Sequence, residues 1–211
     1  KRFSILSLAN NHIMDFGIEG LKETIETLKR NGVLTVGAGG NYHQAMRPLI
    51  LERDSMRIGF VSFTHEEVTL FPPNLTRARQ FHKAGPARYY EKDALETIRK
   101  LKKETDLIVA LIHWGLEYAH FPSPQQRRLG EKLVDNGVNL IIGHHPHVVQ
   151  GFQKYHNGLI FYSLGNFVFD PAISNARHSM MVRFHVSKKG ISKYKITPLD
   201  LNENYQPIRS H

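Results

Sequence analysis

The segment D-L-I-V-A-L-I-H, residues 106–113, decides the fold, because six apolar residues in a row stand between two polar ones. An unbroken apolar run of this length, rich in Ile and Leu, is typical of a strand covered on both faces. Such strands occur in sheets that are flanked by further layers of structure. We therefore expect residues 107–112 to form a central strand of a layered α/β domain.

The segments on either side alternate between helical and strand periodicity. Apolar residues recur at helical spacing in some segments and in short runs or strict alternation in others. The predicted helices are residues 18–30, 91–103 and 125–135, and the predicted strands are 3–8, 33–36, 48–53, 57–63, 107–112, 138–142, 159–164, 180–186 and 191–197. This order predicts one α/β domain with a mixed sheet over residues 1–211. Residues 64–90 are predicted to be an irregular loop.

Composition excludes several classes of chemistry. The chain has 211 residues and no Cys, which rules out disulfides, thiolate nucleophiles and Cys-based metal sites. Lys and Arg total 28 against 19 for Asp and Glu, so the formal net charge is +9. This excess favours anionic partners, although it is dispersed enough to serve only as a solubilising surface. No apolar run approaches the ~20 residues needed to span a bilayer.

Three groups of histidines each follow a predicted strand. His12 follows strand 3–8, His113 follows strand 107–112, and the third group, G-H-H-P-H at 143–147, follows strand 138–142. Sites in α/β sheets form at the carboxyl ends of strands, so these side chains are expected to converge. Neutral imidazole is a good ligand for borderline divalent metals. Ordinary hydrogen-bonded histidines are the alternative, and they are the better explanation for any single one.

The turn around His12 adds further candidates. Asn10 and Asn11 precede His12, and Asp15 follows three residues later. An Asn carboxamide oxygen can bind a divalent cation, and a neighbouring His can act as a general acid. Both Asn residues are alternatively simple turn formers. The glycines at 37–40 are predicted to form a tight turn, since no Gly-Lys-Ser/Thr follows them.

Four motifs in one order resemble a known family. They are S-L-A-N-N-H-I-M-D-F-G-I-E-G-L at 7–21, H-W-G-L-E-Y at 113–118, G-H-H-P-H-V-V-Q-G at 143–151 and Y-S-L-G-N-F-V-F-D at 162–170. Together they resemble the CapA/PgsA-type capsule-biosynthesis family, which is associated with poly-γ-glutamate. That family belongs to the calcineurin-like metallophosphoesterase superfamily. The resemblance implies an αββα sandwich with mixed sheets and a metal site at the strand ends.

The resemblance also implies roles for individual residues. The implied metal ligands are Asn11, His113, His145 and His147, the implied catalytic residues are His12, Asp15 and Glu117, and the implied substrate-facing residues are His144, Ser163 and Asn166. For Asp15, Glu117, Ser163 and Asn166, structural support of the site loops is an equal alternative. Trp114 is expected to pack in the core.

One departure from the family pattern concerns the first strands. Members of the family carry an earlier Gly-Asp strand and a second carboxylate-bearing turn, and this sequence begins after both. We therefore expect an N-terminally incomplete domain that lacks its first strands. A complete domain is implied to hold up to two divalent ions (Mn, Zn or Fe), and this chain one or none, with little or no activity. The resemblance indicates a bacterial protein. Its compartment stays open between cytoplasm and cell envelope, where a missing N-terminal anchor would join it to membrane-associated capsule machinery.

Two functions follow as hypotheses. The first is a metal-dependent phosphoesterase-like hydrolase linked to poly-γ-glutamate capsule biosynthesis, in which metal-activated water attacks an anionic substrate and His12 protonates the leaving group. The second is a non-catalytic component that binds or assembles a polyanionic capsule polymer. Nucleic acid is not an expected partner, because no recognised binding module is present.

Overall fold

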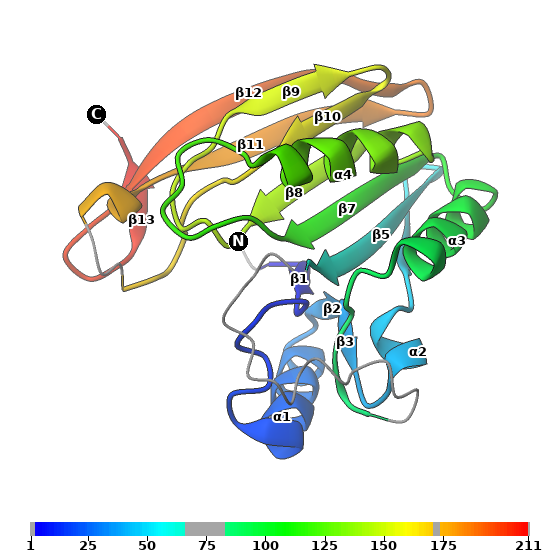
Figure 1. Ribbon diagram of the computed structural model, residues 1–211, viewed down its shortest axis with the longest axis horizontal. Coiled ribbons are helices and arrows are strands. Elements are labelled where there is room, and N and C mark those ends of the chain that lie inside the picture. Colours follow the sequence, from blue (N-terminus) through cyan, green and yellow to red (C-terminus); the bar gives the residue numbers. More distant parts are fainter. Residues whose placement is uncertain (1–2, 66–82, 171–173, 211) are drawn as a thin grey trace.

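The computed structural model describes residues 3–65, 83–170 and 174–210, and a six-stranded sheet forms its centre (Figure 1). The strand order is β4-β5-β7-β8-β10-β9. The bounds are β4 (Leu49–Arg53), β5 (Met56–Thr64), β7 (Leu107–His113), β8 (Leu140–His144), β9 (Phe152–Tyr155) and β10 (Gly158–Phe161). β5, β7, β8 and β10 run parallel, while the edge strands β4 and β9 pair antiparallel. The predicted mixed sheet is therefore confirmed.

β7 shows why the apolar run forms a central strand. Successive side chains in a strand point to opposite faces of the sheet. Ile108, Ala110 and Ile112 join the buried cluster on one face, whereas Leu107 and Val109 join the cluster on the other. Both faces of the strand are thus removed from water, as its composition predicts.

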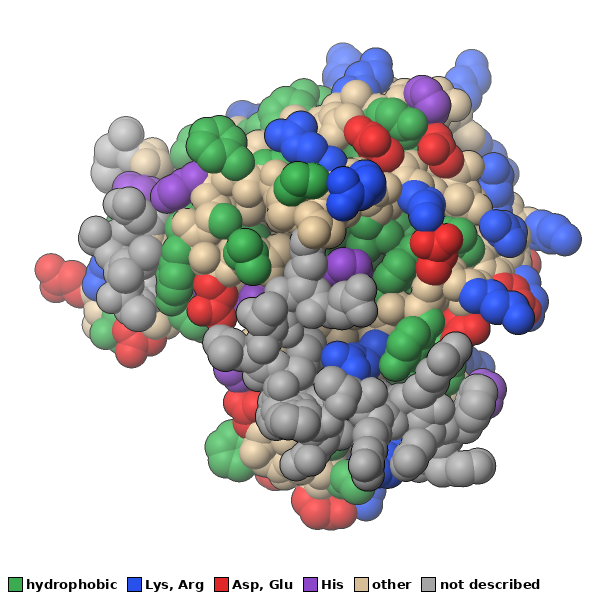
Figure 2. Space-filling view, viewed as in Figure 1, with side chains coloured by type: hydrophobic (Ala, Val, Ile, Leu, Met, Phe, Trp, Pro, Cys, Tyr) green, Lys and Arg blue, Asp and Glu red, His purple; other side chains and the backbone are tan. Residues whose placement is uncertain are grey.

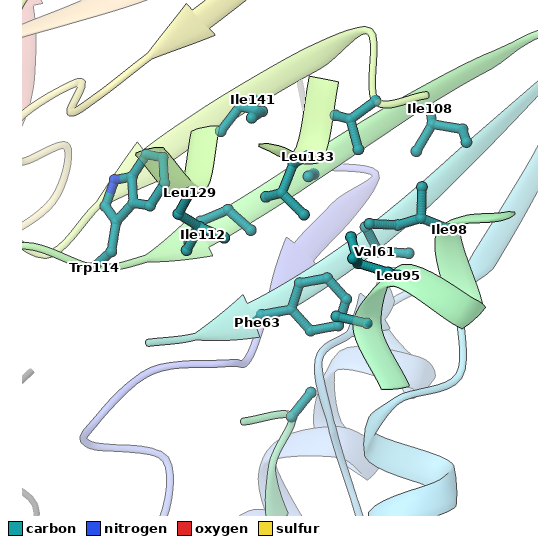
Figure 3. Close-up of a cluster of buried hydrophobic side chains, with 14 of the residues drawn as sticks. Val61, Phe63, Leu95, Ile98, Ile108, Ile112, Trp114, Leu129, Leu133 and Ile141 are labelled. Atoms are coloured by element: carbon teal, nitrogen blue, oxygen red, sulfur yellow. The ribbon is translucent and has the colours of Figure 1, made fainter. Parts of the chain in front are cut away.

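Two helices cover the first face of the sheet. They are α3 (Glu91–Lys102) and α4 (Pro124–Asp135), and their apolar sides meet the sheet in one buried cluster (Figure 3). α4 begins with a capping box, in which the Ser123 hydroxyl accepts from the Gln126 backbone N–H and the Gln126 side chain accepts from that of Ser123. Pro124 at the first helical position suits this start, since it has no N–H to satisfy.

A second layer covers the opposite face. It contains the three-stranded sheet of β11 (His178–Ser187), β12 (Gly190–Leu201) and β13 (Pro207–Arg209). Phe161 of the central sheet meets Phe184 and Tyr194 of this layer, with ring centroids 5.6 and 5.9 Å apart. Aromatic pairs in this edge-on geometry add to the stability gained from burial.

The N-terminal elements lie beside β5. β1 (Ile5–Ser7) pairs in parallel with β2 (Leu34–Val36), and α1 (Gly17–Arg30) packs against β2. The Ser7 and Ser62 hydroxyls are 2.7 Å apart, which ties β1 to β5. The smaller elements are β3 (Ala38–Gly39), α2 (Tyr42–Ala45), β6 (Gly85–Pro86) and the 3-10 helix Ser174–Arg177. The α/β sandwich implied by the resemblance is the observed fold.

Some boundaries differ from the predictions. The predicted strand 138–142 forms at Leu140–His144, because Val138 closes the end of α4 by donating its N–H to the Leu133 carbonyl. β9, β13 and α2 were not predicted, since two are edge strands and the third has a single turn. Residues 66–82 of the predicted loop, including His82, lie outside the described residues. Among the residues that are described, no helix has the length and apolar character to cross a membrane.

Candidate metal centre

The carboxyl ends of β7 and β8 bring the predicted histidines together. β7 ends at His113 and β8 ends at His144, and these two residues are aligned in the sheet. The loop after β8 then supplies His145 and His147. Ring centroids are 4.9 Å apart for His113 and His144, 4.5 Å for His113 and His145, and 5.9 Å for His145 and His147. The structure thus gathers four imidazoles from two strand ends.

Asn11 reaches the same cluster from the loop after β1. Its side chain is buried, and its Oδ1 lies 2.9 Å from His113 Nε2 across 102 residues of sequence. Two ligands at adjacent corners of one ion, each ~2.1 Å from it, are separated by about 3.0 Å. The observed spacing therefore suits either a direct hydrogen bond from Nε2–H to Oδ1 or two atoms that face one cation.

The loop that carries His145 and His147 has an unusual backbone. Their φ values are +103° and +61°, in a region that side chains other than glycine seldom adopt. Each such residue costs about 1–3 kcal/mol and persists only where the surroundings enforce it. Strain of this kind clusters at functional sites. Pro146 lies between the two histidines and limits the ways in which the loop can relax.

Burial keeps the central imidazoles uncharged. Desolvation lowers the pKa of His144 to about 4. Desolvation also lowers the pKa of His145 to about 4, and the neighbouring His147, His144 and His12 act in the same direction. The pKa of His113 is held far below its usual range by desolvation first and then by the other histidines. At neutral pH these rings carry free lone pairs, which is the form that binds a metal.

Two ring nitrogens in the cluster are buried without a hydrogen bond to any of the residues described. Among the described residues, His113 Nδ1 and His145 Nδ1 have no hydrogen-bond partner. Leaving a buried polar atom unpaired costs about 1–3 kcal/mol, so such atoms call for a physical explanation. A divalent cation that faces Asn11 Oδ1 and His113 Nε2 would give His145 Nδ1 an electrophile to bind, whereas His113 Nδ1 lies on the other side of its ring. The donor set of imidazoles and a carboxamide oxygen fits a borderline ion such as Zn²⁺, Mn²⁺ or Fe²⁺.

Glu117 brings a carboxylate to this cluster. One ligand atom from each of Glu117, His145 and His147 lies within 4.8 Å of the other two. Opposite ligands of one ion with ~2.1 Å bonds are about 4.2 Å apart, so the three atoms need only a small adjustment to share an ion. The carboxylate supplies negative charge that the histidines lack. Glu117 is thus placed among the candidate ligands, whereas the motif had implied a catalytic role.

Asn166 orients one of the rings. Its Oδ1 lies 2.8 Å from His147 Nδ1, and its Nδ2 donates to the Ala176 carbonyl at 3.0 Å. A ring whose Nδ1–H is committed in this way presents Nε2 to a metal. This contact favours a positioning role for Asn166 over the substrate contact that the motif implied.

Aromatic side chains border His147 and were not predicted. The Phe169 and Tyr118 ring centroids lie 4.6 and 5.9 Å from that of His147. Both residues belong to quoted motifs, but nothing in the sequence indicates that their rings meet this histidine. Tyr118 takes a left-handed φ of +61°, which turns the loop that also carries Glu117.

The remaining predicted residues lie around the cluster. His12 is exposed, and its Nδ1 lies 2.8 Å from Asp15 Oδ2, so the carboxylate can orient the ring. No hydrogen bond or ring contact joins His12 to the cluster among the described residues, although its charge acts on His113 and His145. The Ser163 hydroxyl is buried and accepts from the Gly165 N–H at 3.3 Å, within its own turn. Trp114 is fully buried, as expected.

Comparison with known families agrees with this architecture. The model of the family described as bacterial capsule synthesis protein PGA_cap matches residues 1–171. The chain belongs to this family. Two relatives align with nearly the whole length of the chain. It is 34% identical over 202 residues to the PGA biosynthesis protein CapA of Bacillus subtilis, and 36% identical over 213 residues to the capsule biosynthesis protein CapA of Bacillus anthracis.

The two alignments cover nearly all of this chain but only part of each relative. The alignments cover 95% and 99% of this chain but only 52% and 50% of the two CapA proteins, so the PGA_cap chain spans about half the length of these relatives. A phosphatase of Mycoplasma pneumoniae has a similar structure, with a TM-score of 0.59 at 12% sequence identity over 96% of this chain and 74% of its own. At that identity the likeness concerns the fold alone.

Proposed function

We propose that this PGA_cap chain carries the metal site of a phosphoester hydrolase that serves poly-γ-glutamate capsule biosynthesis. The observation that carries the proposal is the set of uncharged imidazoles beside Asn11, in which His145 Nδ1 is buried and unpaired among the described residues. A purely structural cluster would be expected to satisfy that nitrogen by a hydrogen bond. The family to which the chain belongs supports the link with capsule synthesis.

The residues divide into ligands and positioning groups. Asn11 and His113 would hold a divalent ion together with His145, and His147 and Glu117 complete the donor set on the other side. Bound metal supplies a Lewis acid for a phosphoryl oxygen and a lowered pKa for water. Asn166 orients the His147 ring, and the His144 ring packs edge-on against that of His113.

His12 is the proton donor in this proposal. It is exposed at the edge of the cluster, where a leaving group can reach it, and its Nδ1 is engaged by Asp15. The bond to Asp15 holds the ring through Nδ1 and leaves Nε2 for the leaving group. Asp15 is therefore a positioning residue and His12 is the catalytic one.

Calorimetric titration of the metal-free chain with Mn²⁺ tests the metal site. We expect saturable binding, and His145→Ala should lower the affinity by at least about tenfold because it removes a ligand. His185→Ala is the matched control, since that histidine is exposed on β11, away from the cluster. Equal affinities for the wild type and both variants would contradict a metal site at this position.

Hydrolysis of bis(p-nitrophenyl) phosphate in Mn²⁺ tests the chemistry separately. His12→Ala should lower kcat by about 10²- to 10⁴-fold, the usual contribution of a general acid, with Mn²⁺ affinity unchanged. Turnover that His12→Ala leaves unchanged would overturn the role of His12, and metal binding without any turnover would favour the second function, a polymer-binding component without catalysis.

A further inference from the structure

A groove at the amino ends of the central strands carries a concentrated positive charge. It has a volume of about 520 Å³, within the range of ligand pockets, and it lies between the start of β7, β8 and β10 and the turn that joins β11 to β12. Four lysines line it: Lys154, Lys188, Lys189 and Lys193. In the space-filling view, Lys and Arg side chains gather along the upper and right-hand margins, where the β11–β12 turn is drawn (Figures 1 and 2).

The charge of these lysines is not neutralised by the protein. Within residues 3–65, 83–170 and 174–210, none of the four takes part in an ion pair. The lining holds a single carboxylate, Asp106, and its Oδ2 already accepts from the Arg57 backbone N–H at 2.8 Å. His156 at the rim is paired with Asp135 at 3.1 Å. A strong excess of one sign in a hollow raises the local concentration of the opposite charge.

The four lysines come together only through folding. Lys154 is on β9, Lys188 and Lys189 are in the β11–β12 turn, and Lys193 is on β12. The two sheets that carry them pack face to face through Phe152, Phe161 and Tyr194. Two of the lysines therefore lie on strands and two in the turn, so the fold brings their backbone positions together around one groove.

We propose that this groove binds an acidic polypeptide through the carboxylates along its chain. Four ammonium groups in one hollow complement the negative charge of a chain with closely spaced carboxylates. Asn139, Asn157 and Ser192 add uncharged polar groups that suit the amides of a peptide chain.

This second site is far from the metal centre. Asp106 precedes β7 and His113 ends it, and the seven residues of that strand span about 20 Å. A polymer held in the groove thus leaves the histidine cluster free. The proposal rests on the proposed function only for the identity of the polymer. It does not need hydrolysis, so the two can fail independently.

The test measures binding of fluorescent poly-γ-glutamate by anisotropy in EDTA, which excludes the metal site. A variant with all four groove lysines changed to Gln should bind at least about fourfold more weakly, because four exposed ion pairs with the polymer are lost together. The matched control changes Lys29, Lys92, Lys102 and Lys103 to Gln, which removes the same charge from exposed positions on α1, on α3 and at the end of α3. The control should keep nearly wild-type affinity.

Two results would overturn the proposal. Equal losses in the groove and control variants would mean that only net charge attracts the polymer. The second result concerns single-stranded DNA of matched charge. If it binds at least as tightly as poly-γ-glutamate and its affinity depends equally on the groove lysines, the groove is a nucleic-acid site. Circular dichroism melting of both variants confirms that each is folded before the affinities are compared.

Discussion

The two ends of the central sheet carry opposite chemistry. At the carboxyl ends, imidazoles are buried, uncharged and held on a strained loop. At the amino ends, lysines are exposed on ordinary strands and turns. The first arrangement costs stability and needs the whole fold to maintain it, whereas the second costs little. Substitutions in the supporting structure should therefore damage the histidine end far more than the lysine end.

The largest effect is expected from Gly143→Ala. A Cβ at this position would collide with the Tyr162 carbonyl and with Trp114 Nε1, two buried groups that are hydrogen-bonded to each other at 2.9 Å. Overpacking of a core costs about 1–3 kcal/mol and more where backbone is struck, so we expect a loss of about 3 kcal/mol or more. Denaturant unfolding measures it, and metal affinity should fall as well.

Gly151→Ala provides the control for that substitution. An added Cβ meets nothing within 4 Å there, and the residue follows the same histidine loop. Its unfolding free energy should stay within about 0.5 kcal/mol of the wild type. If Gly143→Ala were equally harmless, the histidine end would not depend on tight packing and the contrast between the two ends would be lost.

A smaller effect is expected from Asn166→Ala, which removes the partner of His147 Nδ1. Loss of such an orienting bond lowers metal affinity by about 10- to 100-fold. Asn166→Asp keeps an oxygen facing the ring and should recover most of the affinity. Asn157→Ala, at the lysine end, should leave Mn²⁺ affinity unchanged. Full affinity in Asn166→Ala would show that the ring needs no orienting partner.

The sequence predicts the histidine end better than the lysine end. His113 and the 143–147 motif follow apolar runs that fix two neighbouring strands, so their convergence follows from topology alone. The place of Glu117 could not be predicted, because it depends on the left-handed turn at Tyr118. The groove could not be predicted either. Lys188 and Lys189 look like a solvated turn until the pairing of β11 with β12 brings Lys193 and the β9 lysine beside them.

The smallest effect, on the pH dependence of stability, separates the two ends most cleanly. His144 and His145 have pKa values of about 4 in the folded chain and an ordinary value near 6.5 when unfolded. Between pH 6.5 and 4 the unfolded chain binds protons that the folded chain does not, so the free energy of unfolding decreases as pH falls through this window. Each such group contributes a slope of at most about 1.4 kcal/mol per pH unit.

Removal of one of these histidines by His145→Gln should reduce the slope measured by urea unfolding in EDTA near pH 5. The variant with four groove lysines changed to Gln should keep the wild-type slope, because lysines stay charged across the window in both states. An unchanged slope in His145→Gln would mean that its ring is as solvated in the folded chain as in the unfolded one, which is incompatible with a buried, uncharged cluster.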